Sequence, residues 1–471
     1  MRFTKDNSLI ISHLTDIEGN LRYFKQWFDR SDYLRFNEGC LSFADSKLHC
    51  KFIYGGDFCD KGPGDLRIGH ALVDFKTKYP HDVSLIAGNR EIKCRRFSYE
   101  LTNNIRQRLL YGAAAYWNPH KPPREYVVQQ MQAESRPATS EADIERYVLD
   151  KSILTCQTLY LKWMLNETMG CGSQHNKRNT FEYRRMELAN IARLPAQNIS
   201  DDAVTQSFID SVTASGVVTH YLKQAQLGDI IGETLFIHGA ITVENMGFVP
   251  GMEASSARIT DAKEWIETLN NWYKNQINDW LNDSVEDKLH VPGHKPLDRY
   301  VICNPNSIVT SNWYEKGKLL PIPDRVVQFL NAAGIYRVVS GHQPFADFPL
   351  LIRSNNLEVI VGDTSYSDSL AIEDNRGEAL HNLTIIQLEN QSHAFINAIR
   401  KNGSFTTVDL PSRQDVSRGE DTIIGHFTPE GQLIRPLSAS LLSACQLDGF
   451  EVIDNPLKPF QPRNGENNDV P

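Results

Sequence analysis

The sequence predicts an α/β fold that carries large helical insertions. Short apolar or β-branched runs, typical of buried strands, each end just before a string of polar and glycine residues. Apolar residues at helical spacing follow the first of these runs, so strand and helix alternate. Residues 383–410 then alternate between apolar and polar types, which predicts the strands of a second sheet.

The composition is that of an ordinary globular protein. The chain has 471 residues, enough for one large domain with insertions or for two or three smaller domains, and 41% of them are hydrophobic. The formal net charge of −9 argues against a nucleic-acid partner, which would require a basic face. No apolar stretch approaches the roughly 18 to 20 residues of a transmembrane segment. The first residues also lack the apolar core of a secretory signal, although a delivery route that uses no such signal stays open.

The cysteines indicate a reducing compartment such as the cytoplasm. All eight lie outside any C-x-x-C pair or regular framework, so we expect free thiols. Cys59 and Cys94 lie close to the polar strings that follow two of the strands, and we expect both to serve in buried packing.

Five predicted strands end close to a side chain that can bind a metal ion. The strands are 9–14, 51–54, 83–86, 234–237 and 336–339, and the side chains that follow them are Asp16, Asp57, Asn89, His238 and His342. Ligands collect at the carboxyl ends of the strands in an open α/β sheet. We therefore expect the five ends to converge on one crevice.

Helices are predicted after the first strand and in two insertions. Asn20 is placed to cap a helix over residues 21–28. In an insertion at about 101–228, Ser140 begins a helix with a Ser-x-x-Asp cap. In another at about 250–330, Thr260 can cap a helix whose tryptophans lie near one face and are expected in the core. We expect these insertions to form a cap over or beside the crevice.

These strings resemble a known superfamily. In order, they are Asp16-Ile17-Glu18, the string from Gly56 to Gly62, the string from Gly88 to Glu91, His238-Gly239-Ala240 and Gly341-His342-Gln343. Their order resembles the calcineurin-like metallophosphoesterases. The last three are similar to the protein serine/threonine phosphatase branch, and the second and third look closer still to divergent phosphatases of protists and to effector phosphatases of intracellular bacteria.

The resemblance covers roughly residues 9–100 and 225–375. It implies a two-sheet β-sandwich core flanked by helices, within a catalytic domain over residues 1–415. Residues 416–471 would form a C-terminal extension that is partly disordered, above all over the Pro-, Asn- and Gly-rich residues 456–471. If the chain is a bacterial effector, it would be delivered into a host cell.

The resemblance also implies a site for two divalent metal ions. Asp57 would bridge them, with Asp16 and Glu18 at the first ion and Asn89, His238 and His342 at the second. Glu18 departs from the family pattern, which usually has His there. A carboxylate makes the first site harder, which favours Mn²⁺ or Mg²⁺ over Zn²⁺ or iron, with Mn²⁺ the expected ion. The alternative role for Glu18 is an interaction with the dipole of the next helix.

Arg90 is the second departure from the family. The family has a His there, taken as the general acid and oriented by the residue that corresponds to Asp60. Arginine stays protonated, so it cannot be that acid, but it can hold a phosphate oxygen and pair with Asp60. Protonation of the leaving group must then come from another source, or must matter less because the leaving group is acidic.

Other cations and one acid complete the candidate site. Lys61 and Arg67 are expected to bind the substrate phosphate together with Arg90. Arg95 and Arg96 are further candidates, each at least as well explained as a solvated helix charge. Asp363 either orients a ligand histidine or caps a turn.

Three functions fit these residues. The resemblance favours a metal-dependent phosphomonoesterase, a protein serine/threonine phosphatase in which a hydroxide activated by the two metals attacks a phosphorylated protein. The alternative keeps the chemistry but takes nucleotides or other small phosphoesters, whose acidic leaving groups would tolerate Arg90. The third is a phosphatase-like binding protein with little turnover.

Overall fold

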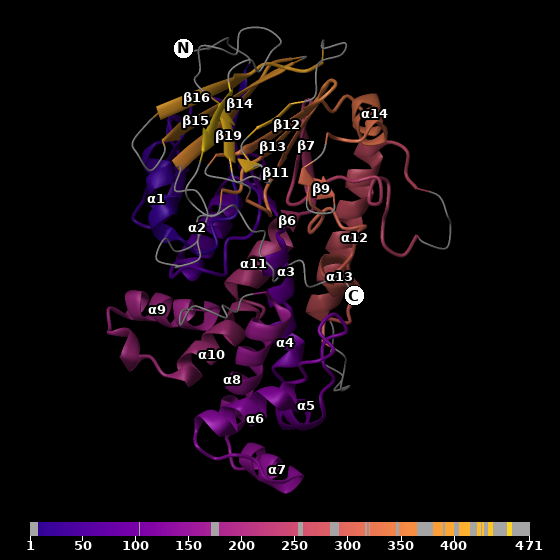
Figure 1. The fold of residues 1–471 in the computed structure, drawn as a ribbon. Coiled ribbons are helices and arrows are strands. Elements are labelled where there is room, and N and C mark those ends of the chain that lie inside the picture. Colours follow the sequence, from indigo (N-terminus) through magenta and orange to yellow (C-terminus); the bar gives the residue numbers. More distant parts are fainter. Residues whose placement is uncertain are drawn as a thin grey trace.

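Two large mixed β-sheets, three smaller sheets and a large helical region make up the described part of the chain (Figure 1). The computed structural model describes residues 8–102, 104–170, 179–252, 258–282, 292–315, 318–319, 321–344, 348–364, 380–389, 391–399, 405–414, 422–424, 426–427, 432–436 and 450–454. The predicted α/β class is confirmed. The predicted domain boundary at about residue 415 stays a prediction, and the residues 456–471 expected to be disordered lie outside the described part.

The first sheet has the strand order β16-β15-β14-β1-β4-β5-β6. Its strands are β1 (Leu9–Leu14), β4 (Cys50–Tyr54), β5 (Val83–Ile86), β6 (Ala225–Gln226), β14 (Leu380–Gln387), β15 (Ser392–Ile399) and β16 (Phe405–Leu410). Strands β1, β4, β5 and β6 are parallel, whereas β14 runs antiparallel to β1 and is followed by the antiparallel strands β15 and β16.

The second sheet has the order β17-β12-β13-β11-β8-β7. Its strands are β7 (Gly228–Ile231), β8 (Thr234–Ile237), β11 (Arg337–Ser340), β12 (Leu350–Ser354), β13 (Leu357–Val361) and β17 (Thr422–Ile424). Strands β8, β11 and β13 are parallel, and the other three run antiparallel to their neighbours.

The sheet assignment made from the sequence is wrong in two respects. The rule for one open sheet was applied to five strand ends, but these strands are divided between the two sheets, three in the first and two in the second. Residues 383–410, expected in a second sheet, extend the first sheet through the pairing of β14 with β1. Alternation along a strand reports which faces are buried, but the same pattern fits any neighbouring strand.

One apolar cluster contains buried residues of both sheets. The first sheet contributes Ile11 and Ile53, and the second contributes Val339 and Ile360. The sheets therefore share a core. The strand ends of both sheets meet at the candidate site, because the backbone N–H of His342, after β11, donates to the carboxylate of Asp16, after β1.

Several predicted helices are confirmed. In α1 (Leu21–Asp29) the Asn20 side chain accepts from the Tyr23 N–H, and in α7 (Glu141–Leu149) Ser140 accepts from the Asp143 N–H. The Thr260 cap is wrong: Asp261 accepts from the first N–H groups of α12 (Ala262–Asn282). Asp261 stands one residue closer to the helix, and its carboxylate reaches the N–H groups two and three residues on. The expected burial of Trp265 in α12 is confirmed.

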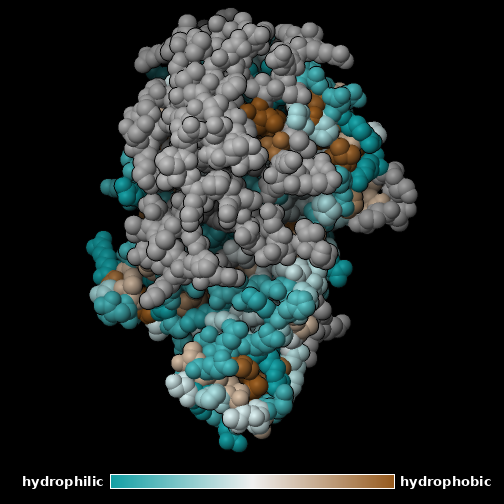
Figure 2. Space-filling view, in the orientation of Figure 1, coloured by the Kyte–Doolittle hydropathy of each residue, from teal (hydrophilic) through white to brown (hydrophobic). Residues whose placement is uncertain are grey.

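The helices between β5 and β6 extend away from the sheets, and the face visible in Figure 2 is mainly hydrophilic over them, with isolated hydrophobic spots. They are α3 (Asn89–Cys94), α4 (Arg96–Glu100), α5 (Ile105–Tyr111), α6 (Pro123–Ala133), α7, α8 (Ile153–Trp163), the π-helix η1 (Met164–Thr168), α9 (Thr180–Ala192), the short 3₁₀ helix η2 (Ala196–Asn198), α10 (Asp201–Ser211) and α11 (Val217–Gln224).

The remaining elements are α2 (Asp65–Lys78), α13 (Pro296–Val301), α14 (Asp324–Ala332), β2 (Leu34–Asn37), β3 (Cys40–Phe43), β9 (Tyr314–Glu315), β10 (Lys318–Leu319), β18 (His426–Phe427), β19 (Gln432–Pro436) and β20 (Phe450–Asp454). Among the described helices, none combines the length and apolar character needed to cross a membrane.

Candidate metal centre

The first two polar strings are joined through their backbones. The Asp16 N–H donates to the Gly56 carbonyl and the Glu18 N–H donates to the Asp57 carbonyl, each at 2.9 Å. The side chains of Asp16, Glu18 and Asp57 are all buried. Three carboxylates predicted as metal ligands are therefore held in one buried loop pair.

Unusual backbone conformations are concentrated at the predicted site residues. Ten non-glycine residues of the described chain have positive φ, and half of them are predicted site residues: Asp16, Glu18, Asp57, Asp60 and His342. Such conformations cost free energy and persist where the surrounding structure fixes them, often at functional sites. The strand ends are thus bent so that their polar side chains gather.

His238 has the orientation of a metal ligand. Its Nδ1 lies 2.8 Å from the Gly55 carbonyl, which can only accept, so Nδ1 carries the hydrogen. Its Nε2 faces Asn89 Oδ1 at 3.2 Å and Asp57 Oδ1 at 3.4 Å. Burial opposes protonation of this ring, but Asp57 and Asp16 outweigh it and raise the pKa of His238 to about 10. These carboxylates thus favour a positive charge at Nε2.

Three side chains from both sheets could hold one cation. Ligand atoms of Asp57, His238 and His342 all lie within 4.8 Å of one another. The pKa of Asp16 is raised well above its usual value by burial and by repulsion from Asp363. A bound cation would relieve that repulsion, and imidazole with carboxylate is a donor set that divalent metals accept. The residues therefore fit a metal ion.

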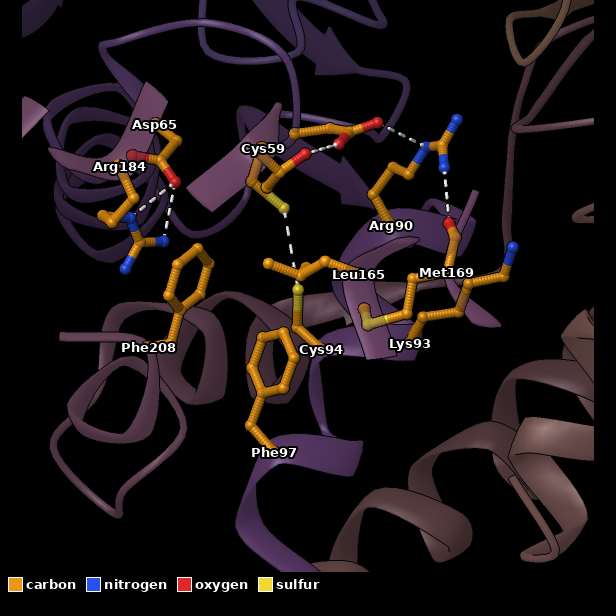
Figure 3. A pocket seen from close by; sticks show the side chains of 12 residues that line it. Cys59, Asp65, Arg90, Lys93, Cys94, Phe97, Leu165, Met169, Arg184 and Phe208 are labelled. Carbon is orange, nitrogen blue, oxygen red and sulfur yellow. Dashed lines mark hydrogen bonds and ion pairs between the residues drawn. The ribbon is translucent and has the colours of Figure 1, made fainter. Parts of the chain in front are cut away.

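Arg90 lies among the acidic residues, as Figure 3 shows in part. Its guanidinium is 4% exposed, and Nε lies 3.3 Å from Asp60 Oδ2 and 3.7 Å from Asp57 Oδ2. Nη2 lies 3.9 Å from Glu18 Oε1, and Nη1 donates to the Met169 carbonyl at 2.9 Å. The predicted pair of Arg90 with Asp60 is present. A permanent positive charge thus lies beside the candidate metal ligands.

Asp60 and Lys61 lie close together. Lys61 Nζ is 3.8 Å from Asp60 Oδ2, and the Lys61 side chain is 19% exposed. The other Asp60 oxygen accepts a hydrogen bond from the hydroxyl of Thr180, at the start of α9. Lys61 therefore remains partly open to solvent next to the buried Arg90 and Asp60.

Arg67 is held elsewhere. Its guanidinium forms a forked pair with Glu187 of α9, with Nη2 2.5 Å from Oε2, and Nη2 also donates to the Pro63 carbonyl. Its phosphate-binding role stays a prediction and would require this pair to open. Of the other two candidates, Arg95 pairs with Asp298, and Arg96 pairs with Glu100.

Two supporting residues were missed from the sequence. Glu91 accepts backbone N–H groups of Asp57, Phe58 and Gly88, which fixes the second string against the third. Burial, followed by repulsion from Asp57, raises the pKa of Glu91 to about 7. Its place in the third string was a signal that could have been used. No such signal marked Thr180, because it lies in the insertion and outside the polar strings.

The comparisons with known proteins give only distant structural likenesses. No family model matches this chain, and no curated protein matches it. Among solved structures, a mutant form of a cold-active protein tyrosine phosphatase is 12% identical, with a TM-score of 0.38 over 86% of this chain and 82% of that one. A protein serine/threonine phosphatase from Saccharomyces cerevisiae, described as similar to human phosphatase PP5, is 11% identical, with a TM-score of 0.31 over 80% of this chain and 72% of that one. At such TM-scores, neither likeness bears on what this chain does.

Proposed function

We propose that this chain is a metal-dependent phosphomonoesterase that acts on phosphorylated proteins, as a protein serine/threonine phosphatase of the calcineurin-like superfamily. One observation supports it above the others: ligand atoms of Asp57, His238 and His342 gather within 4.8 Å, beside the buried cation Arg90. A metal-binding cluster next to a fixed guanidinium suits a phosphate, because both bind its oxygens.

The site would hold two divalent ions, with Mn²⁺ expected. Asp57 would be shared, Asp16 and Glu18 would complete the first ligand set, and Asn89, His238 and His342 would complete the second. When bound, such ions polarise phosphoryl oxygens and lower the pKa of a water molecule. Gly55, through its bond to Nδ1, orients the His238 ring so that Nε2 faces Asn89 and Asp57, and Nε2 would release its proton on binding an ion.

The protein's own cations would bind and orient the substrate. Arg90 would hold phosphate oxygens, while Asp60 and the Met169 carbonyl fix its guanidinium. Lys61, partly exposed, would add a point charge at the edge of the site. Since Arg90 cannot release a proton, the leaving group must take one from elsewhere.

The choice of a protein substrate rests on the family resemblance and on the helical insertions, which could form a rim as wide as a protein surface. Nucleotides and other small phosphoesters are the alternative. A binding protein with little turnover is the third candidate. One assay separates the three.

The test is Mn²⁺-dependent phosphate release from matched phosphoserine, phosphothreonine and phosphotyrosine peptides and from nucleotides. Wild type is compared with Asp57→Asn and with a control, Asp74→Asn, which alters an exposed carboxylate of α2. Mn²⁺ affinity is measured by calorimetry on all three. We expect peptide turnover that chelation and Asp57→Asn abolish and Asp74→Asn preserves. Turnover of nucleotides alone would show that the substrates are nucleotides and not phosphorylated proteins. Mn²⁺ binding without any turnover would favour the binding protein.

A further inference from the structure

Two thiols lie together beside the candidate metal centre. The Sγ atoms of Cys59 and Cys94 are 4.0 Å apart and point toward each other (Figure 3). Cys59 belongs to the loop between Asp57 and Asp60, and Cys94 is the last residue of α3, whose first two residues are Asn89 and Arg90. The thiol pair therefore lies between the two strings that supply Asp57, Asn89 and Arg90.

A small cavity lies beside this pair. It has a volume of about 20 Å³, and its lining includes both thiols together with Asp60, Arg90 and Phe97. This is room for about one water molecule, so only a very small reactant can enter without side-chain movement. Cys59 is buried at 5% exposure, whereas Cys94 is partly exposed. A small oxidant would thus reach Cys94 first.

We propose that Cys59 and Cys94 are an oxidation site, at which a peroxide converts the two thiols into a disulfide. The Cys94 sulfur attacks the O–O bond of the peroxide; an S–O bond forms, the O–O bond breaks, and one water leaves with the thiol proton. The Cys59 sulfur then attacks Cys94; an S–S bond forms, the S–O bond breaks, and a second water leaves. The two thiols supply the two electrons that reduce hydrogen peroxide to two waters. A dithiol reverses the change by exchange.

Disulfide formation is expected to disturb the site. An S–S bond is about 2.05 Å long, so the two sulfurs have to approach by about 2 Å from their present separation. Asp57 Oδ1 accepts from the Arg90 N–H at 2.9 Å, and Arg90 Nε lies 3.3 Å from Asp60. Both contacts join the Cys59 loop to α3, so we expect them to shift wherever the bond draws these two elements together. The effect on turnover rests on the proposed function, and the oxidised form is expected to be slower.

The experiment treats the full chain with hydrogen peroxide and then with dithiothreitol. Thiols are counted by alkylation, the linkage is mapped by mass spectrometry of an unreduced digest, and Mn²⁺ affinity and phosphatase rate are recorded at each stage. Variants are Cys94→Ser, Cys94→Ala and, as a control, Cys303→Ser, which removes an exposed thiol. We expect wild type and the control to lose two thiols, to gain the 59–94 linkage and to slow at least fivefold, with recovery on reduction. Both Cys94 variants, once their folding is verified by circular dichroism, are expected to keep their rate and their Mn²⁺ affinity under peroxide.

Some outcomes overturn the proposal. A disulfide between other cysteines, or sulfinic acid at Cys94 without the 59–94 disulfide, would contradict the proposed oxidation site. Equal loss of rate in wild type and in the Cys94 variants would show that the disulfide does not control the site. If no form turns over phosphoesters, the proposed function fails, while the mapped linkage and the Mn²⁺ affinities still decide whether the disulfide forms and disturbs the metal centre.

Discussion

The Thr180 hydroxyl donates a hydrogen bond to Asp60 at 2.5 Å, across 120 residues of sequence. Earlier in the same insertion, the Met169 carbonyl accepts from Arg90. Both members of the Asp60–Arg90 pair are thus held by the helical insertion. The insertion, whose helices extend away from the sheets, therefore also contributes to the candidate site.

Thr180→Val should slow turnover by roughly tenfold, with most of the change in kcat. The hydroxyl bonds a carboxylate, and such hydrogen bonds contribute about 1.5–3 kcal/mol, enough for Asp60 and with it Arg90 to lose their alignment. Steady-state kinetics on a phosphopeptide measure this. Thr180→Ser keeps the hydroxyl and should restore most of the rate. Equal rates in the Val and Ser variants would show that this bond does not position Asp60.

Arg90→His should raise the rate on phosphoserine relative to an aryl phosphate. A histidine at this position could protonate an alkoxide leaving group, an effect typically worth about 10²–10⁴ in rate. An aryl leaving group gains less because it is already acidic. The ratio of the two rates is compared with that of Arg90→Gln, which removes the charge without supplying an acid. A ratio that does not change would mean that position 90 plays no part in leaving-group chemistry.

Gly341→Ala should weaken Mn²⁺ binding by roughly 10–100-fold, the range seen when residues that support metal ligands are changed. A Cβ atom here would come within 2.0 Å of Asp16 Oδ2 and 2.5 Å of Thr15 Oγ1, so Asp16 must move. Calorimetry measures the affinity. Gly334→Ala is the control: its positive φ of 75° strains the backbone, but its Cβ would meet nothing within 4 Å, so it tests strain that does not displace Asp16. Unchanged affinity in Gly341→Ala would remove Asp16 from the metal site.

Glu358→Gln should destabilise the fold by about 3–5 kcal/mol at neutral pH, because it breaks a buried ion pair. Arg337 lies 2.9 Å from Glu358 Oε1 and Arg353 lies 2.7 Å from Oε2. Burial alone would raise the pKa of Glu358, but the two arginines outweigh it and lower the pKa below the ordinary 4.5.

The sign of the pH dependence follows from that lowered pKa. The stabilisation by Glu358 is complete above about pH 4.5, where the unfolded chain has also lost the proton, and it disappears as the pH falls through the lower folded value. Urea unfolding at pH 7 and at about pH 3 to 4 should therefore show a smaller difference between wild type and Glu358→Gln at acid pH. A difference that stays constant would argue that the ion pair contributes no pH-dependent stability.

The strand ends were predictable because five buried strands each end close to a side chain that can bind a metal ion, a coincidence that single turn residues do not explain. Asp16 and Asp57 were found from their positions after strands together with the family resemblance, and the structure buries both side chains. Sheet membership was not predictable, since the alternation in β14 says which of its faces is buried but not that its neighbour is β1. Thr180 was not predictable either, because only the folded chain brings a residue of the insertion to Asp60.

Strand β17 has a practical consequence for anyone who shortens the chain. It pairs with β12, whose other neighbour is β13, so β17 covers the edge of the second sheet. A protein that ended at residue 415, the predicted domain boundary, would expose a row of unpaired N–H and C=O groups along β12. Such open edges recruit strands from other molecules. A truncated form is therefore expected to self-associate in concentrated solution, even if every residue of the candidate metal centre is retained.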